Sequence, residues 1–64
     1  MISYLTGKPL YELDGGLVLD VRDVGYHIEL TEPTLNWTLM QETISLWIHT
    51  VVRETSFELY GFET

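Results

Sequence analysis

The fold is decided by residues 43–62, Thr-Ile-Ser-Leu-Trp-Ile-His-Thr-Val-Val-Arg-Glu-Thr-Ser-Phe-Glu-Leu-Tyr-Gly-Phe. Side chains alternate with a period of two from Ile44 to His49 and again from Phe57 to Tyr60, which a strand requires and a helix forbids. The polar residues 53–56, Arg-Glu-Thr-Ser, separate the two halves. The stretch therefore predicts a long β-hairpin with a charged tip. Because binding residues often lie on loops held by a rigid scaffold, the tip is the first candidate site.

The composition describes one small domain. A chain of 64 residues buries only about 60% of its unfolded surface, so it needs an efficient core or a partner. It contains no cysteine, which excludes disulfides and thiolate zinc sites. No apolar run reaches the roughly 20 residues of a membrane span, and the N-terminus lacks the pattern of a signal peptide. We expect a cytoplasmic protein.

The charge is strongly acidic. Three Lys and Arg residues stand against ten Asp and Glu residues, giving a formal net charge of −7. Nonspecific affinity for nucleic acids comes from basic side chains that neutralise phosphates, so the totals argue against a simple phosphate-binding surface. They argue equally against docking on anionic membranes. Disorder is not indicated, because 45% of the residues are hydrophobic.

The first half of the chain predicts a three-stranded meander. Residues 1–13 form one long, bent strand. The alternation changes phase along it, since Ile2 and Tyr4 share one parity and Leu5 the other, and a bulge at Gly7 would explain this because glycine within a strand often marks a bulge. Residues 14–16, Asp-Gly-Gly, predict a hairpin turn. Residues 17–21 form the second strand and residues 24–30 the third, joined at Arg22-Asp23. The side chains predicted to face the core are Leu17, Leu19, Val21, Val24, Tyr26, Ile28 and Leu30, with His27 and Glu29 facing outward.

Residues 31–41 interrupt the strand pattern. Thr31 is a suitable helix cap, and Pro33 is tolerated in a first helical turn. One or two turns would have an apolar face made by Leu35, Trp37, Leu39 and Met40. We expect a short helix or helical turn between the third and fourth strands.

Together these elements predict an all-β OB-fold, a five-stranded Greek-key barrel with a short helix or helical turn between strands 3 and 4. An SH3-like barrel is the alternative architecture. Residues 1–64 form this single domain. Neither fold fixes a function by itself.

Catalytic and metal chemistry are not indicated. His27 and Glu29 share one strand face, but no third ligand is recognisable and His49 lies on another strand. The serines Ser3, Ser45 and Ser56 lack a nucleophile-elbow context. The Asp14-Gly15-Gly16 stretch is a turn signal, not a phosphate-binding loop. We expect a non-catalytic chain that uses no metal and no cofactor.

Aromatic residues raise the question of single-stranded nucleic acid, since OB-fold binders combine stacking aromatics with a basic groove. Only Lys8, Arg22 and Arg53 could supply the basic part. The simpler interpretation places most of the aromatics in the core or at an interface. The aromatics concerned are Tyr4, Tyr11, Trp37, Trp47 and Tyr60.

Four segments, taken together, resemble the N-terminal domain of the RuvA family of bacterial Holliday-junction-binding proteins. They occur in the family's order and at its spacing over residues 1–62. The most specific is His-x-Val-Val-Arg-Glu at 49–54, followed closely by Leu-Tyr-Gly-Phe at 59–62. The others are Met-Ile-x-x-Leu-x-Gly at 1–7 and Val-Gly-Tyr at 24–26.

The resemblance implies an OB-fold domain at the centre of a homotetramer that binds four-way junction DNA in an open conformation. It also implies a separate ATPase partner, RuvB, which drives branch migration in DNA recombination and repair. The hairpin tip corresponds to the family's acidic pin, so Arg53, Glu54 and Thr55 are the candidate DNA-junction residues. Carboxylates that face phosphates repel them, which makes acidity at this point a device for specificity.

The sequence departs from the family at two places. Thr55 stands where a second acidic residue is usual, so we expect one pin carboxylate for each subunit and weaker repulsion. Glu58 lies too far along the strand to be expected to replace it. Arg22-Asp23 stands where Gly-Gly is typical, and Asp23 would tolerate a positive φ better than most residues.

The resemblance covers only the family's first domain. Its helix-hairpin-helix domain, which supplies most DNA backbone contacts, and its ATPase-binding domain are expected to lie outside this chain. We therefore expect weak DNA binding by these residues alone. Two alternatives remain open: a stand-alone OB-like protein-interaction domain with an acidic face, and a weak single-stranded nucleic-acid binder.

Overall fold

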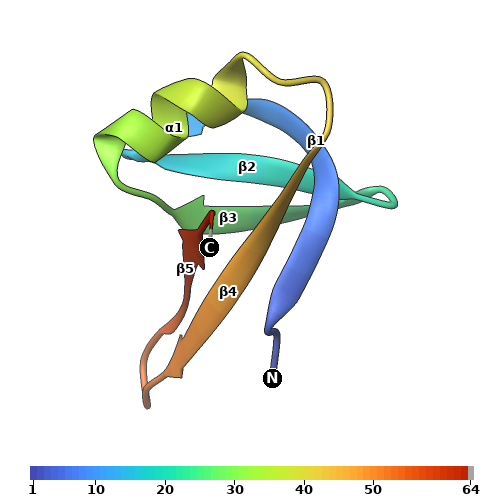
Figure 1. The fold of residues 1–64 in the computed structure, drawn as a ribbon. Helices are drawn as coiled ribbons and strands as arrows, with labels where there is room; N and C mark the ends of the chain where they lie inside the picture. The colour runs from blue at the N-terminus through green and yellow to red at the C-terminus, as the bar shows by residue number, and fades with distance from the viewer. Residues whose placement is uncertain (64) are drawn as a thin grey trace.

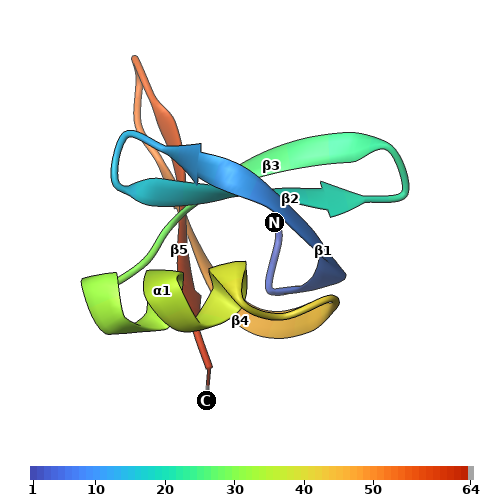
Figure 2. The ribbon, with the colours of Figure 1, turned by 90° about the horizontal axis from the view of Figure 1, so that it is seen from above.

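Five strands and one helix form a closed barrel in the computed structural model, which describes residues 1–63 (Figure 1). Helix α1 covers one end of the barrel, and the turn between β4 and β5 projects from the opposite end (Figures 1 and 2). The elements are β1 (Tyr4–Leu13), β2 (Gly16–Val21), β3 (Val24–Glu29), α1 (Glu32–Leu39), β4 (Ile44–Val52) and β5 (Phe57–Phe62).

The strand order around the barrel is β1-β2-β3-β5-β4, with β4 pairing back to β1. Every neighbouring pair is antiparallel except β3 and β5, which run parallel and pair only at Ile28↔Leu59 and Glu29↔Tyr60. The helix lies between β3 and β4, as predicted. The all-β OB-fold prediction is therefore confirmed, in preference to the SH3-like alternative.

The alternation of β4 builds the core. Its even-numbered residues from Ile44 to Thr50 are buried, whereas Ser45, Trp47 and His49 are exposed. The predicted inward positions of β2 are confirmed at Leu17 and Leu19, which are fully buried. The core consists of Leu17, Leu19, Ile28, Leu35, Ile44, Leu46, Ile48 and Leu59, with Ile2, Leu5, Val21, Tyr26 and Leu30 packed against it.

Two tight turns use left-handed backbone conformations. In the β1–β2 turn, Asp14 and Gly15 have φ angles of 50° and 78°. In the β2–β3 turn, Arg22 and Asp23 have φ angles of 51° and 72°. The Asp23 amide donates a 2.8 Å hydrogen bond to Asp20 Oδ1, which helps to hold the second turn. Arg22 has a Cβ that opposes this conformation, so the turn is strained there.

The predicted bulge at Gly7 is wrong. The register of β1 against β2 shifts between Pro9 and Tyr11 instead. The change of phase that suggested a bulge arises because Ile2 precedes the strand, which begins at Tyr4. Gly7 is required for another reason: a Cβ at this position would overlap the carbonyl oxygen of Asp20.

Several residues predicted to be inward are exposed. Val24, which begins β3, is 51% exposed because the strand extends beyond the barrel there. On α1 only Leu35 of the expected apolar face is buried, together with Thr38. The other three members of that face, Trp37, Leu39 and Met40, are exposed. Thr31 is the N-cap residue, but its hydroxyl donates to Thr34 Oγ1 at 3.0 Å and makes no cap bond to the backbone.

The strain at Arg22 predicts that Arg22→Gly stabilises the fold. Relief of the left-handed conformation is worth about 1–2 kcal/mol, and the greater freedom of glycine in the unfolded chain offsets part of it. We expect the free energy of unfolding to rise by about 0.5–1 kcal/mol in denaturant titrations. Arg22→Ala is the control, because alanine retains the Cβ and should give no gain. An equal gain from both variants would contradict the explanation.

The close approach at Gly7 predicts that Gly7→Ala is destabilising. The added methyl group must displace the backbone of β2, and we expect a loss of about 1–3 kcal/mol in the free energy of unfolding. Gly25→Ala is the matched control, since a Cβ there meets only Val18 Cγ1 at 3.3 Å. Equal destabilisation by the two substitutions would show that backbone contact at Gly7 is not the cause.

Candidate functional site

The tip (residues 53–56) lies at the end of a hairpin that leaves the barrel. Strands β4 and β5 pair from Trp47↔Phe62 to Val52↔Phe57. Strand β1 accompanies β4 only as far as Trp47, and β3 accompanies β5 only at Leu59 and Tyr60. The outer part of the hairpin is thus flanked by neither strand, and it projects as Figures 1 and 2 show. The molecule measures 34 × 24 × 22 Å along its principal axes.

The structure brings the three predicted pin residues together at this tip. Arg53, Glu54 and Thr55 are exposed, and the Arg53 amide closes the turn with a 2.8 Å hydrogen bond to the Ser56 carbonyl oxygen. The predicted hairpin and its polar tip are confirmed as structural features. Contact between these residues and DNA stays a prediction.

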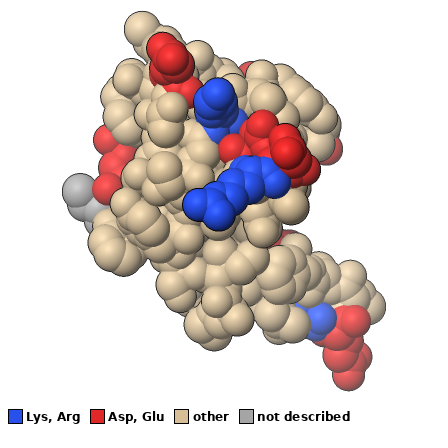
Figure 3. All heavy atoms as spheres, turned by 90° about the vertical axis from the view of Figure 1, so that its right-hand side faces the viewer, with Lys and Arg blue, Asp and Glu red and all other residues tan. Residues whose placement is uncertain are grey.

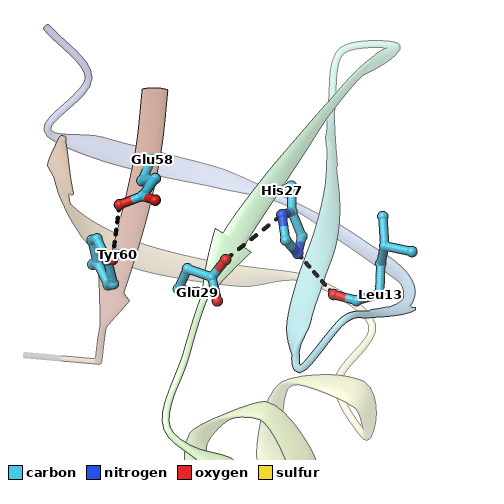
Figure 4. Close-up of polar contacts among 5 residues, drawn as sticks. All are labelled: Leu13, His27, Glu29, Glu58 and Tyr60. Atoms are coloured by element: carbon cyan, nitrogen blue, oxygen red, sulfur yellow. Dashed lines mark hydrogen bonds and ion pairs between the residues drawn. The ribbon is translucent and has the colours of Figure 1, made fainter. Parts of the chain in front are cut away.

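Glu58, which we did not expect to replace the second pin carboxylate, contacts a residue of the tip. Its Oε1 atom lies 3.4 Å from Arg53 Nη1 and accepts a 3.0 Å hydrogen bond from the Tyr60 hydroxyl. Figure 4 shows the Glu58 carboxylate directed at Tyr60 on the same face of β5. The period of two in residues 57–60 places Glu58 and Tyr60 on one face, so the sequence contained this signal.

Glu58 also alters the chemistry of Tyr60. The pKa of the Tyr60 phenol is raised above its ordinary value of 10.0, first because Glu58 accepts its hydrogen bond and second because Glu58 is negatively charged. The Glu29 carboxylate raises this pKa further, whereas the Arg53 guanidinium lowers it. The phenol therefore remains a hydrogen-bond donor at neutral pH.

The aromatic residues that we assigned mainly to the core or an interface are not core residues. Tyr4, Tyr11, Trp37, Trp47 and Tyr60 are each at least 36% exposed. An aromatic face (Tyr4, Trp47 and Phe62) crosses three neighbouring strands. The rings of Tyr4 and Trp47 are 4.7 Å apart and inclined by 58°, which is a favourable tilted contact.

A shallow, mostly apolar groove lies on the outer surface where β3, β4 and β5 meet. Its volume is about 370 Å³. Tyr60 connects this groove to the hairpin, because its hydroxyl contacts Glu58. The lining residues are Glu29, Leu30, Thr31, His49, Tyr60, Gly61 and Phe62.

The two histidines do not form a metal centre. His27 Nε2 lies 2.7 Å from the Leu13 carbonyl oxygen, and its Nδ1 lies 3.8 Å from Glu29 Oε2 (Figure 4). The predicted sharing of one face by His27 and Glu29 is thus observed. His49 is on β4, opposite Tyr60. Within residues 1–63, no three His, Asp or Glu side chains gather as metal ligands would.

The charged groups form no continuous basic surface on the face shown in Figure 3, where acidic and basic groups are intermixed. They gather on the upper part of the molecule and at the projecting lower end, with uncharged surface between (Figure 3). The projecting end corresponds to the tip in Figure 1. Within the described part of the chain, no helix has the length and apolar character needed to span a membrane.

Comparison with known proteins identifies the family. The sequence profile described as "RuvA N terminal domain" matches residues 1–61. The chain is 41% identical over 64 residues to the "Holliday junction branch migration complex subunit RuvA" of Pelobacter propionicus, covering 100% of this chain and 32% of that protein. The protein of the same description from Geobacter sp. strain M21 is 44% identical over 66 residues, and the match covers 100% of this chain and 33% of that protein.

A more distant relative of the same description, from Lactococcus lactis subsp. lactis, is 36% identical over 62 residues. The match covers 97% of this chain and 32% of that protein. The chain thus spans about a third of the length of the curated relatives that it matches. The profile match extends over the whole barrel, from before β1 into the end of β5. On this evidence the chain belongs to the RuvA N-terminal domain family.

Proposed function

We propose that this chain is the pin-bearing, non-catalytic module of a subunit that binds Holliday junctions during branch migration, in DNA recombination and repair. The observation that carries the proposal is the projecting β4–β5 hairpin, with Arg53 and Glu54 exposed at its tip, in a chain of this family. The loop between strands 4 and 5 is also one of the two loops with which OB-folds commonly bind oligonucleotides.

Glu54 would act by repulsion. It is the exposed carboxylate within the tip, since Thr55 occupies the neighbouring position. At the centre of a four-way junction, carboxylates facing phosphates would favour separated strands over a continuous duplex. The effect is electrostatic and is screened by salt, so it discriminates between DNA shapes without supplying affinity.

Affinity would come from other parts of the subunit. The chain carries three Lys and Arg residues against ten Asp and Glu residues. Too few phosphates can be neutralised by these side chains to hold DNA at physiological salt. The family resemblance assigns backbone contacts to helix-hairpin-helix motifs and the engagement of a RuvB-like ATPase to a further domain. The complex would act in the cytoplasm.

Assembly into a homotetramer would cover exposed apolar surface. Tyr4, Trp47 and Phe62 are 49%, 55% and 50% exposed, respectively, and they adjoin one another on β1, β4 and β5. Contiguous exposed apolar patches of this kind are typical of interaction sites. A subunit interface would also supply the extra burial that a small barrel needs.

A stand-alone protein-interaction domain is the second candidate. The apolar groove beside the aromatic face favours it, because such a groove with the acidic Glu29 in its lining suits a basic, apolar partner segment. Single-stranded nucleic acid is less well supported: exposed aromatics are present, but the face in Figure 3 has no continuous basic groove.

The charge balance predicts that the 64-residue chain alone binds a four-way junction more weakly than micromolar at physiological salt. Fluorescence anisotropy with a labelled junction and a duplex of matched length measures this. Detectable binding should emerge only as the ionic strength falls. Micromolar or tighter binding at physiological salt would contradict the assignment of affinity to other domains.

The repulsion by Glu54 predicts a loss of selectivity in Glu54→Gln. We would replace the N-terminal domain of the Geobacter relative with residues 1–62 and measure binding to a junction and a duplex by gel shift. Removing the carboxylate should tighten duplex binding by roughly two- to fivefold and reduce the preference for the junction, as expected for a screened surface charge.

Glu42→Gln is the matched control, because Glu42 is an exposed carboxylate that precedes β4, at the end of the strand remote from the tip. It should leave the preference unchanged. A parent chimera that shows no junction preference would favour the protein-interaction alternative. Equal effects of the two substitutions would mean that total charge, not the tip, determines selectivity.

A further inference from the structure

Arg53 is the one basic residue of the β4–β5 hairpin, and the structure shows it bound to a neighbour instead of extended. Its Nη1 atom lies 3.4 Å from Glu58 Oε1. A guanidinium is the side chain best suited to grip a phosphate, because its planar fork of donors matches phosphate oxygens. An unrestrained Arg53 would therefore oppose the repulsion that Glu54 exerts.

We propose that Glu58 is a specificity-determining residue, which holds the Arg53 guanidinium against β5 and so keeps it from the DNA phosphates. The inference rests on the proposed junction-binding function and extends it to a residue outside the tip. The three side chains Arg53, Glu58 and Tyr60 are termed the brace below.

The geometry makes Glu58 the fixed member of the brace. Its side chain is 32% exposed, compared with 62% for Arg53. The Tyr60 hydroxyl donates to the same carboxylate oxygen that faces Arg53, at 3.0 Å. Tyr60 lies on the paired part of β5, opposite His49 on β4 and Glu29 on β3. The carboxylate is therefore oriented from the barrel side, and Arg53 folds back toward it from the tip.

The charge balance of the hairpin follows from this contact. The positive charge of Arg53 is compensated by Glu58, so the charge of Glu54 remains uncompensated at the tip. The family usually has its second acidic residue at the position of Thr55, and Glu58 stands three positions later. Glu58 would nevertheless support the repulsion by Glu54. It does not repel DNA from the tip itself; it removes a cation that would attract DNA.

An exposed ion pair is weak by itself and is screened by salt. The second contact, from Tyr60, reduces the entropy that Glu58 loses when it binds Arg53, because the carboxylate is already oriented. The brace should therefore act most strongly at low ionic strength. Tyr60→Phe should weaken it without abolishing it.

The brace can be tested without DNA through the titration of Tyr60, followed by its ring NMR signals at alkaline pH. The groups that face the phenol are Glu58, Arg53 and Glu29, with His49 opposite on β4. Glu58→Gln should lower the pKa of Tyr60 toward its ordinary value, and Arg53→Gln should raise it further. An unchanged pKa in Glu58→Gln would overturn the brace, whatever the chain does with DNA.

The raised pKa of Tyr60 also makes the stability of the fold depend on pH. A phenol whose pKa is higher in the folded than in the unfolded state favours folding while it is protonated. The contribution of Tyr60 is therefore complete below the unfolded pKa of about 10, and it is lost as the pH rises through the folded pKa. Glu58→Gln should reduce this alkaline dependence.

The DNA test is a double-mutant cycle on the 64-residue chain at low ionic strength, with NMR titrations of a four-way junction and a matched duplex. Glu58→Gln should tighten duplex binding by roughly threefold and reduce the junction preference, within the range of a surface ion pair. In the Arg53→Gln background, the same substitution should have little effect, because no cation remains to be released.

Each outcome decides the proposal. An equal effect of Glu58→Gln in both backgrounds would show that Glu58 is only another negative charge, and no effect in either would show that it has no part in selectivity; both overturn the inference. Glu12 is an exposed carboxylate on β1, so Glu12→Gln is the control. It should change neither the affinity for the junction nor the affinity for the duplex. The pKa of Tyr60 could respond as expected while the parent chain shows no preference for the junction. That combination would indicate that the brace exists and that the proposed function is wrong.

Discussion

The structure depends on a very short parallel pairing between β3 and β5. Only Ile28↔Leu59 and Glu29↔Tyr60 join these strands, yet they close the barrel. Gly61 suits this close approach, since a Cβ there would lie 2.7 Å from Leu30 Cδ2 and 2.8 Å from Ile28 Cγ2, and these side chains would have to shift. Because the closure ends at Leu59, the remainder of the hairpin is free to extend beyond the core. One constraint thus completes the core and leaves the outer part of the hairpin beyond it.

The sequence predicted the fold wherever one face of a strand packs on the core. Period-two alternation located β4 and the buried part of β3, because a shift of one residue would bury the wrong side chains. It failed at Val24, where β3 leaves the barrel, since alternation specifies a face but not whether that face is covered. The exposure of Trp37 has the same cause: a short helix can appear amphipathic when little of it touches the core.

The candidate site was predictable in position but not in its contacts. A polar interruption between two alternating segments located the tip from local pattern alone. The contact between Arg53 and Glu58 depends on how far the guanidinium folds back, which spacing does not specify. The pair Glu58 and Tyr60 could have been recognised, since they are two residues apart on one strand and a phenol beside a carboxylate is a ready hydrogen-bond donor.

The acidity of the chain and its proposed partner are compatible once affinity and selectivity are separated. Repulsion lowers the affinity for every DNA form, but it lowers it most for a form that places phosphates against the carboxylates. Such discrimination requires that the repelling charge be held in place and that no nearby cation cancel it. The paired strands of the hairpin meet the first requirement for Glu54, and the contact of Arg53 with Glu58 meets the second. Selectivity at the tip would therefore depend on a carboxylate that lies outside it.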